Sequence, residues 1–340
     1  MTLEQKRLDG ISILRLIATL GIMFFHIGFG HYYFKFLNPD FGVHLFLCIS
    51  AFLFMYTTQT KTAGVFLKNR LIRIVPLYAI LTVLTYLASN LLGNLYPEKT
   101  TTTDLIKSLL FIPYSRGSLK GGDAVRPIVG PAWTLYYDIW FTFVFALAMK
   151  INKKWRGLIA SCVCIVFYVL GEILPKGYAI SHYLNVRLWF DFIAGISVFY
   201  IWKYLSQKIS SRAIVLSGII AVLSILTLYM VPTRKILLPL ISLVILISTL
   251  LSTVHFRAPK FLNWFSNLSY SFYLVHYYVI IILGKVFNFT VLSGKTVVGS
   301  ILVLGISLLI STFSYKIVEI WLSKILKRWL IEKPSAKAKQ

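Results

Sequence analysis

The sequence predicts an all-α protein, a polytopic transmembrane helical bundle, and three observations carry that prediction. The chain of 340 residues is 58% hydrophobic and only 14% charged, with a mean hydropathy of +0.77. Its apolar residues fall into about ten runs long enough to span a bilayer. The short segments between these runs alternate between rich and poor in Lys and Arg. No soluble domain of this length buries so much apolar surface, so we expect about ten membrane crossings.

The predicted spans follow one another along almost the whole chain. They cover residues 10–29, 40–58, 70–93, 131–149, 156–174, 183–203, 212–230, 236–253, 265–285 and 295–323. The seventh and eighth are separated by the short turn Val231–Lys235, which contains Pro232. Residues 1–323 therefore form one ten-helix transmembrane domain in this prediction. Residues 324–340 form a basic cytoplasmic tail that begins at the membrane surface.

The distribution of Lys and Arg predicts that both termini are cytoplasmic. With that orientation, cytoplasmic segments carry 21 of the 35 basic residues and external segments carry 11, five of them in one long loop. This bias is the one that orients membrane proteins. The same bias accounts for the net charge of +24. We do not expect nucleic-acid binding, because the sequence has no nucleic-acid-binding motif and no basic stripe. The long loop, Gly93–Gly130, is either a solvated connection or an external lid and acceptor-binding surface.

Arg15 and His26 are the most informative polar residues, because both lie in the first apolar run, eleven positions apart. Eleven helical residues bring a side chain back to within about 20° of its starting direction and advance it by about 16 Å. A charged Arg in a bilayer costs several kcal/mol unless it faces protein or water. We therefore predict that the face shared by Arg15 and His26 lines a cavity.

The chemistry of these two side chains leaves several roles open. His26 is a candidate general base, since imidazole titrates near neutral pH, and the alternative is an interfacial histidine that snorkels. Arg15 can bind a phosphate or carboxylate, stabilise an oxyanion or form an ion pair with another span. Arg70 and Arg73 lie three residues apart at the cytoplasmic entrance of the third span. They either set the topology or bind the phosphates of an anionic donor.

Polar and aromatic residues of two further spans extend the predicted cavity. Asp138 lies about as deep in the fourth span as His26 lies in the first, and can orient the imidazole or bind sugar hydroxyls. Trp133 and Tyr137 fit an interfacial aromatic belt and a sugar-stacking surface equally well. The ninth span places three candidate substrate-binding residues along one broad face, although such groups also bond across helices: Ser269, Tyr273 and His276.

Other residues are predicted to be structural. Arg187 and Asp191 are spaced to form an internal ion pair, which we favour over a direct catalytic role. Glu319 is expected to pair with Lys316 or with an arginine, and Asp9 to cap the first helix. The three cysteines are interpreted as small apolar residues without metal-ligand spacing: Cys48, Cys162 and Cys164.

Taken in order, several segments resemble the membrane acyltransferase-3 family over nearly the whole chain. The resemblance is carried by RLDGISILRLIATLGIMFFH, FGVHLFLCISAFLF, RLIRIVPLY, PAWTLYYDIWF, RLWFDFIAGI, SYSFYLVH and YKIVE. The first segment includes the family's Arg followed, after ten residues, by His. This chain departs from the family pattern at three places. The family commonly has Glu where Asp138 stands, an acidic residue near His44, and Ser-Gly where Ser50 and Ala51 stand.

The resemblance implies transfer of an acyl group, usually acetyl from acetyl-CoA, to a hydroxyl of an extracytoplasmic or lipid-linked glycan. It implies a location in the bacterial cytoplasmic membrane, and nothing in the sequence demands a metal. In this interpretation His26 deprotonates the acceptor hydroxyl or relays its proton, Arg15 holds the donor or the oxyanion, and Asp138 orients His26 or the acceptor. Arg70 and Arg73 bind the CoA phosphates.

Two other classes of function remain open at the level of sequence. Intramembrane Arg, His and Asp also suit a proton-coupled transporter or flippase for a glycan or lipid. A membrane subunit that only recruits a glycan synthase is the third hypothesis.

Overall fold

The computed structural model describes residues 8–27, 41–91, 99–115, 126–230, 237–286 and 297–331. Within these ranges the chain is helical and contains no strand, which confirms the all-α prediction for this part of the chain. The helices are α1 (Gly10–His26), α3 (Phe41–Thr57), α4 (Ala63–Leu91), α5 (Thr102–Leu109), η2 (Gly130–Ala132), α6 (Trp133–Ile151), α7 (Arg156–Ile173), α8 (Ala179–Leu184), α9 (Leu188–Leu205), α10 (Ser211–Met230), α11 (Leu238–Ser252), α12 (Lys260–Val286), α13 (Val297–Ser314), η5 (Tyr315–Leu322) and α14 (Ser323–Leu330).

Six helical segments in the described ranges are long and apolar enough to cross a membrane. They are Ala63–Leu91, Gly130–Ile151, Arg156–Ile173, Ala179–Leu205, Lys260–Lys285 and Val298–Leu330. Shorter apolar helices occupy the other predicted spans: Gly10–His26, Phe41–Thr57, Ser211–Thr227 and Leu238–Ser252. Large apolar side chains are exposed along α4, α7, α10 and α13, and such a surface suits lipid rather than water. The chain is thus a multi-pass membrane protein, while ten crossings and cytoplasmic termini stay predictions.

Helix α3 is the centre of the bundle, packed against α9 and α1 and also against α11 and α6. Its neighbours approach closely because small residues lie at the contacts. A Cβ added at Gly195 of α9 would lie 2.1 Å from the carbonyl oxygen of Cys48 on α3. A Cβ added at Gly42 of α3 would lie 2.7 Å from the carbonyl oxygen of Ala18 on α1. These contacts bring the backbones of α1, α3 and α9 together.

Aromatic rings fill the space between α3, α6 and α9. Phe54 of α3 stacks on Phe141 of α6 with ring centroids 5.4 Å apart, and Phe141 stacks on Phe192 of α9 at 3.9 Å. All three side chains are buried. Aromatic stacking adds to the free energy gained by burial, so this cluster fixes the position of α6 relative to α3.

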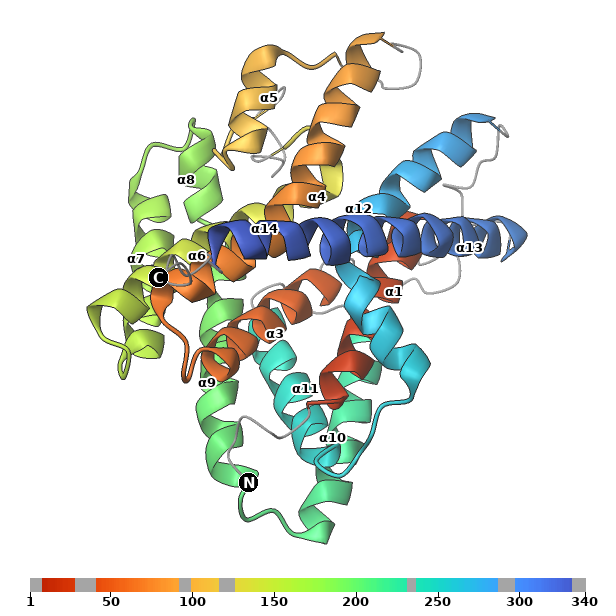
Figure 1. The fold of residues 1–340 in the computed structure, drawn as a ribbon. Coiled ribbons are helices and arrows are strands. Elements are labelled where there is room, and N and C mark those ends of the chain that lie inside the picture. Colours follow the sequence, from red (N-terminus) through yellow and green to blue (C-terminus); the bar gives the residue numbers. More distant parts are fainter. Residues whose placement is uncertain are drawn as a thin grey trace, which may run out of the picture.

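The C-terminal part of the described chain is one long helix that crosses the front of the molecule in Figure 1. Its α13 segment packs on α12, and its α14 segment packs on α4. Lys68 Nζ donates to the carbonyl oxygen of Leu330 over 2.8 Å, and Ser323 Oγ donates to that of Ile72 over 3.3 Å. Because α14 follows η5 without a break, the helix continues to Leu330, past residue 323, where the last span was predicted to end. Residues 332–340 of the predicted tail lie outside the described residues.

The predicted ion pair between Arg187 and Asp191 is wrong. Arg187 is exposed and precedes the first turn of α9, whereas Asp191 is fully buried one turn later. Asp191 Oδ2 instead lies 2.6 Å from Nδ1 of buried His44 on α3. A buried carboxylate needs a partner at its own depth, and the guanidinium at the helix start is not at that depth.

The structure also bears on three smaller expectations, for Asp9, for the long loop and for the cysteines. Asp9 stands at the start of α1 but makes no side-chain cap, because its carboxylate accepts from the backbone N–H of Ala258 over 3.0 Å. The long loop contains the short helix α5, and its residues 93–98 and 116–125 lie outside the described part of the chain. The three cysteines are free, with Cys48 and Cys164 buried and Cys162 exposed.

Candidate active site

A cavity of about 130 Å³ lies between α1, α3, α4, α6 and α12. Apolar side chains of α1 and α3 form part of its wall, among them Ile22 and Leu47. The polar residues that line it are Arg15, Ser50, Arg70, Arg73, Thr134, Asp138, Ser269, Tyr270 and Tyr273. Arg15 of the first span and the basic pair of the third span therefore meet at one cavity, whereas His26, predicted to share its wall with Arg15, is not among the lining residues.

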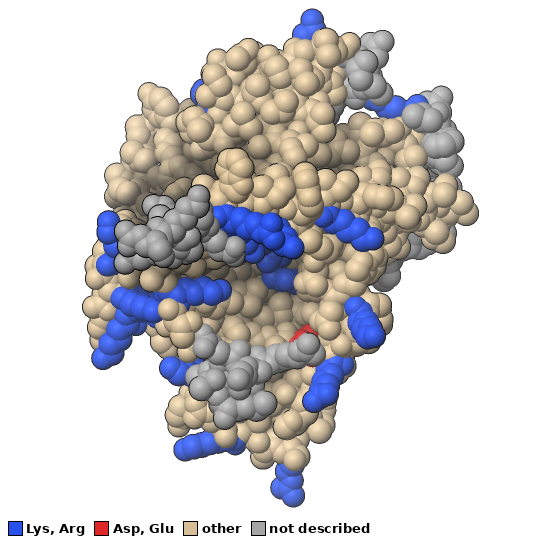
Figure 2. Space-filling view, in the orientation of Figure 1, with Lys and Arg blue, Asp and Glu red and all other residues tan. Residues whose placement is uncertain are grey.

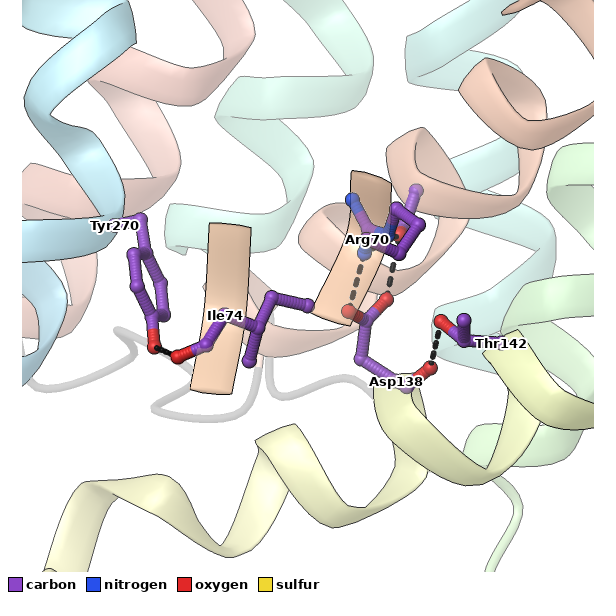
Figure 3. A network of polar contacts seen from close by, with 6 residues as sticks. Arg70, Ile74, Asp138, Thr142 and Tyr270 are labelled. Carbon is purple, nitrogen blue, oxygen red and sulfur yellow. Dashed lines mark hydrogen bonds and ion pairs between the residues drawn. The ribbon is translucent and has the colours of Figure 1, made fainter. Parts of the chain in front are cut away.

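An ion pair joins two walls of this cavity. Arg70 Nη2 donates to Asp138 Oδ2, and Figure 3 shows the carboxylate facing the guanidinium between α4 and α6. Ser50 of α3 donates to the other carboxylate oxygen over 2.6 Å and accepts from Arg70 over 3.3 Å. The guanidinium carbon also lies 4.6 Å from the centre of the Phe54 ring. Arg70 and Asp138 thus hold each other in place, and Asp138 is not bonded to His26 as the sequence analysis allowed.

Arg15 and Arg73 are the remaining positive charges of the cavity. Neither forms an ion pair within 4.0 Å with a carboxylate of the described residues. The charges of Arg15, Arg70 and Arg73 act on one another across the cavity, and Glu319 of η5 acts on Arg15 and Arg73. Three guanidinium groups around a small cavity create a positive potential that suits an anionic ligand.

Glu319 forms no ion pair with Lys316 or with an arginine among the described residues, although one of these was expected. Its carboxylate accepts from Ser271 Oγ of α12 over 2.5 Å, while Lys316 is exposed. It lies in the π-helical segment of the long C-terminal helix. Segments of this kind often occur at functional sites, because the extra residue turns side chains away from the α-helical register.

Basic residues also gather on the surface near this region. Figure 2 shows Lys and Arg around a hollow on the face below the long C-terminal helix, while the upper part of the same face is nearly free of them. Such a concentration of Lys and Arg on one side of the molecule is typical of membrane proteins. The positive charge of these residues would attract an anionic solute to the hollow.

His26 has a different neighbour from the one expected. Its Nδ1 lies 2.9 Å from Nε2 of His276, which projects from α12. Neither histidine lines the cavity, whose wall reaches Ile22 one turn before His26 and Tyr273 one turn before His276. The histidine pair therefore lies just beyond one end of the cavity. His276, predicted to bind substrate, instead contacts the candidate base.

Tyrosines of α12 border the cavity and are held by hydrogen bonds. The Tyr273 hydroxyl donates to the carbonyl oxygen of Pro131 over 2.5 Å and lies 2.8 Å from Thr134 Oγ1. The Tyr270 hydroxyl donates to the carbonyl oxygen of Ile74 on α4 over 2.7 Å, as Figure 3 shows. Both bonds tie α12 to other walls of the cavity, so these rings are fixed in position.

Trp133 and Tyr137 lie away from the cavity. Tyr137 is only 2% exposed, and its ring stacks on Tyr183 with centroids 4.4 Å apart. Trp133 meets the edge of the Tyr137 ring at 6.2 Å. Both therefore belong to the aromatic packing around α6, and the structure does not place them where a sugar in the cavity would stack.

Ser50 and Tyr270 line the cavity but were not predicted from the sequence as site residues. Ser50 lies in an apolar span, where one hydroxyl carries little signal, and its importance follows only from its bonds to Arg70 and Asp138. Tyr270 belongs to the same polar stripe as Ser269 and Tyr273, so a fuller reading of that stripe would have included it. In the described ranges, no group of three or more His, Cys, Asp or Glu side chains is arranged to hold a metal ion.

Comparisons with known proteins identify the family of this chain. The profile of a family described as "Acyltransferase domain" matches residues 8–316. Over 164 residues, the chain is 26% identical to the "Exopolysaccharide production protein ExoZ" of Rhizobium meliloti (strain 1021). This aligned region covers 47% of this chain and 50% of that protein. The match thus spans about half the length of this curated relative. No solved structure matches the chain.

Proposed function

Because this chain belongs to the membrane acyltransferase-3 family, we propose that it moves an acetyl group from acetyl-CoA to a hydroxyl of a surface glycan or its lipid-linked precursor. The name of the relative from Rhizobium meliloti, which refers to exopolysaccharide production, supports a glycan acceptor. The proposed location is the cytoplasmic membrane of a bacterium, with both termini in the cytoplasm. The donor then comes from the cytoplasm and the acceptor from the opposite side.

The observation that carries the proposal is the convergence of Arg15, Arg70 and Arg73 on one cavity whose end adjoins the histidine pair. CoA is an anion with several phosphates, and arginine is the side chain best suited to bind phosphate oxygens. In the proposal Arg73 and Arg70 hold the donor phosphates, and Asp138 with Ser50 keeps Arg70 in position. The thioester is then directed along the cavity toward its histidine end.

The reaction at that end needs a base and a site for negative charge. His26 Nε2 takes the proton of the acceptor hydroxyl while the hydroxyl oxygen attacks the thioester carbonyl carbon. The carbon–sulfur bond then breaks, the CoA thiolate leaves, and the proton passes from His26 to sulfur. The negative charge that forms on the carbonyl oxygen passes to the CoA thiolate as it leaves, while Arg15, about 16 Å away along the same helix, holds the donor together with Arg70 and Arg73. Ser269 and Tyr273 line the cavity and contact the substrates in this proposal.

The test uses purified protein in lipid vesicles with isotopically labelled acetyl-CoA and candidate glycans. We expect an acetylated glycan by mass spectrometry with wild-type protein and none with His26→Ala of equal thermal stability. A transporter or flippase would instead move glycan or lipid across the vesicle membrane without any gain of acetyl mass. Full acetylation by the His26→Ala variant would remove the proposed mechanism.

A further inference from the structure

The contact between His26 and His276 fixes where the protons of both rings lie. The two rings come from α1 and α12, helices that pack along each other, and their nitrogens are 2.9 Å apart. A neutral imidazole has one nitrogen that donates and one that accepts, and the choice is set by the partners of each nitrogen. The question is which nitrogen donates in this pair.

The carbonyl oxygen of Phe272 determines which nitrogen donates. His276 Nδ1 lies 3.1 Å from the carbonyl oxygen of Phe272, one turn earlier on α12. A carbonyl oxygen only accepts, so His276 Nδ1 carries the hydrogen. The other nitrogen of neutral His276, Nε2, then has a lone pair and accepts from His26 Nδ1–H. It follows that Nε2 of His26 has the free lone pair, and no partner for this atom is found among the described residues.

The surroundings of the pair favour this uncharged arrangement. Buried apolar side chains lie within one helical turn of the two histidines, including Met23 on α1 and Phe272 and Val279 on α12. The Phe272 ring lies nearly parallel to that of His276, at 6° and 5.9 Å, and limits rotation of the imidazole. A carboxylate in such surroundings would have a high desolvation cost, whereas a neutral imidazole orients its partner without burying a charge.

We propose that His276 is a positioning residue that holds His26 in the Nδ1–H tautomer, with the Nε2 lone pair available to the acceptor hydroxyl. This inference rests on the proposed function, in which His26 is the base. During transfer, the hydroxyl proton moves to His26 Nε2, the new oxygen–carbon bond forms, and the carbon–sulfur bond breaks. The proton then passes to the thiolate. The Nδ1–H bond to His276 is retained throughout and stabilises the transient imidazolium.

Two variants separate positioning from packing. His276→Gln supplies an amide oxygen that can accept from His26 Nδ1–H, whereas His276→Leu fills the space without an acceptor. We expect His276→Leu to lower kcat about 100-fold, as for other residues that orient a functional histidine, with little change in KM for acetyl-CoA. We expect His276→Gln to keep kcat within about 10-fold of wild type. His255→Leu, at an exposed histidine after α11, is the matched control and should retain full activity.

Nitrogen-15 NMR of labelled histidine reads the tautomer without any turnover. The chain has six histidines, and the signal lost in His26→Ala identifies His26. We expect the Nδ1–H tautomer at His26 in wild type and in His276→Gln, and a shift toward Nε2–H in His276→Leu. Wild-type His26 in the Nε2–H form, or a His276→Leu variant with unchanged kcat and tautomer, overturns the inference. Wild-type protein that transfers no acetyl group overturns the proposed function instead, and the NMR result still decides whether His276 sets the tautomer.

Discussion

Arg70 on α4 and Asp138 on α6 form an ion pair across the wall of the cavity, with side chains only 21% and 10% exposed. The pair has two consequences, because it joins two helices and it fixes the direction of a guanidinium that faces the cavity. Removing either partner leaves the other charge inside the protein without compensation. Replacing both with apolar residues of similar size leaves no such charge.

This difference gives the first prediction. Asp138→Leu should lower the midpoint of thermal unfolding in detergent, because Arg70 is left unpaired. The double variant Arg70→Met with Asp138→Leu should regain most of that midpoint and still transfer no acetyl group, because the guanidinium is lost. Thermal unfolding followed by circular dichroism, together with the acetylation assay, measures both effects. A double variant with normal activity would show that Arg70 does not contact the donor.

The second prediction concerns Arg73, which lines the cavity without a carboxylate partner within 4.0 Å among the described residues. Arg73→Gln should raise KM for acetyl-CoA about 10-fold, the equivalent of ~1.4 kcal/mol, because one charged contact to a phosphate is lost. KM for acetyl-pantetheine, which has the thioester but no phosphate, should stay the same. Lys150→Gln, at an exposed position near the end of α6, is the control for general loss of charge. Equal effects on both donors would contradict a phosphate contact.

Hydropathy predicted the helices well because the bilayer itself sets the length of each apolar run. Residues 156–174 and 212–230 were predicted, and the helices cover Arg156–Ile173 and Ser211–Met230. Helical periodicity likewise predicted that Arg15 faces a cavity, because a charge in a span has few other places to go. These properties depend on local sequence and on the solvent around the helix.

The partners of the polar groups were not predictable in the same way. His26 bonds to a residue 250 positions away, and Asp191 bonds to His44, 147 positions earlier. Spacing along the sequence suggested Arg187 as the partner of Asp191, because such spacing identifies only partners on the same helix. The burial of Tyr137 was not predictable for a related reason, since an aromatic residue near a span end has the same sequence pattern in a packed core and in a binding surface. Pairings between helices depend on packing, which one sequence does not specify by spacing.

The third prediction follows from the contact between His44 and Asp191, which ties α3 to α9. His44→Leu should destabilise the protein by about 3 kcal/mol, because the Asp191 carboxylate stays buried without its partner. Asp191→Asn should cost less, since its amide oxygen still accepts from His44. Unfolding in a mixed detergent series gives both values. Since neither residue lines the cavity, the specific activity of the folded fraction should not change in Asp191→Asn, and a large loss there would indicate a direct role.

The last prediction tests the close packing of α9 on α3. A side chain at Gly195 would meet the carbonyl oxygen of Cys48 at 2.1 Å and the Ala51 methyl group at 2.8 Å, and neither can move away, because both belong to the backbone or to its first carbon. Gly195→Leu should therefore force the two helices apart, lower the yield of folded protein and abolish activity. Gly305→Leu on α13 is the matched control, because nothing lies within 4 Å of an added Cβ there. Size-exclusion chromatography and thermal unfolding compare the two variants. If Gly195→Leu folds as well as Gly305→Leu, then α3 and α9 are not held at the distance described, and the placement of the cavity wall that depends on α3 must be revised.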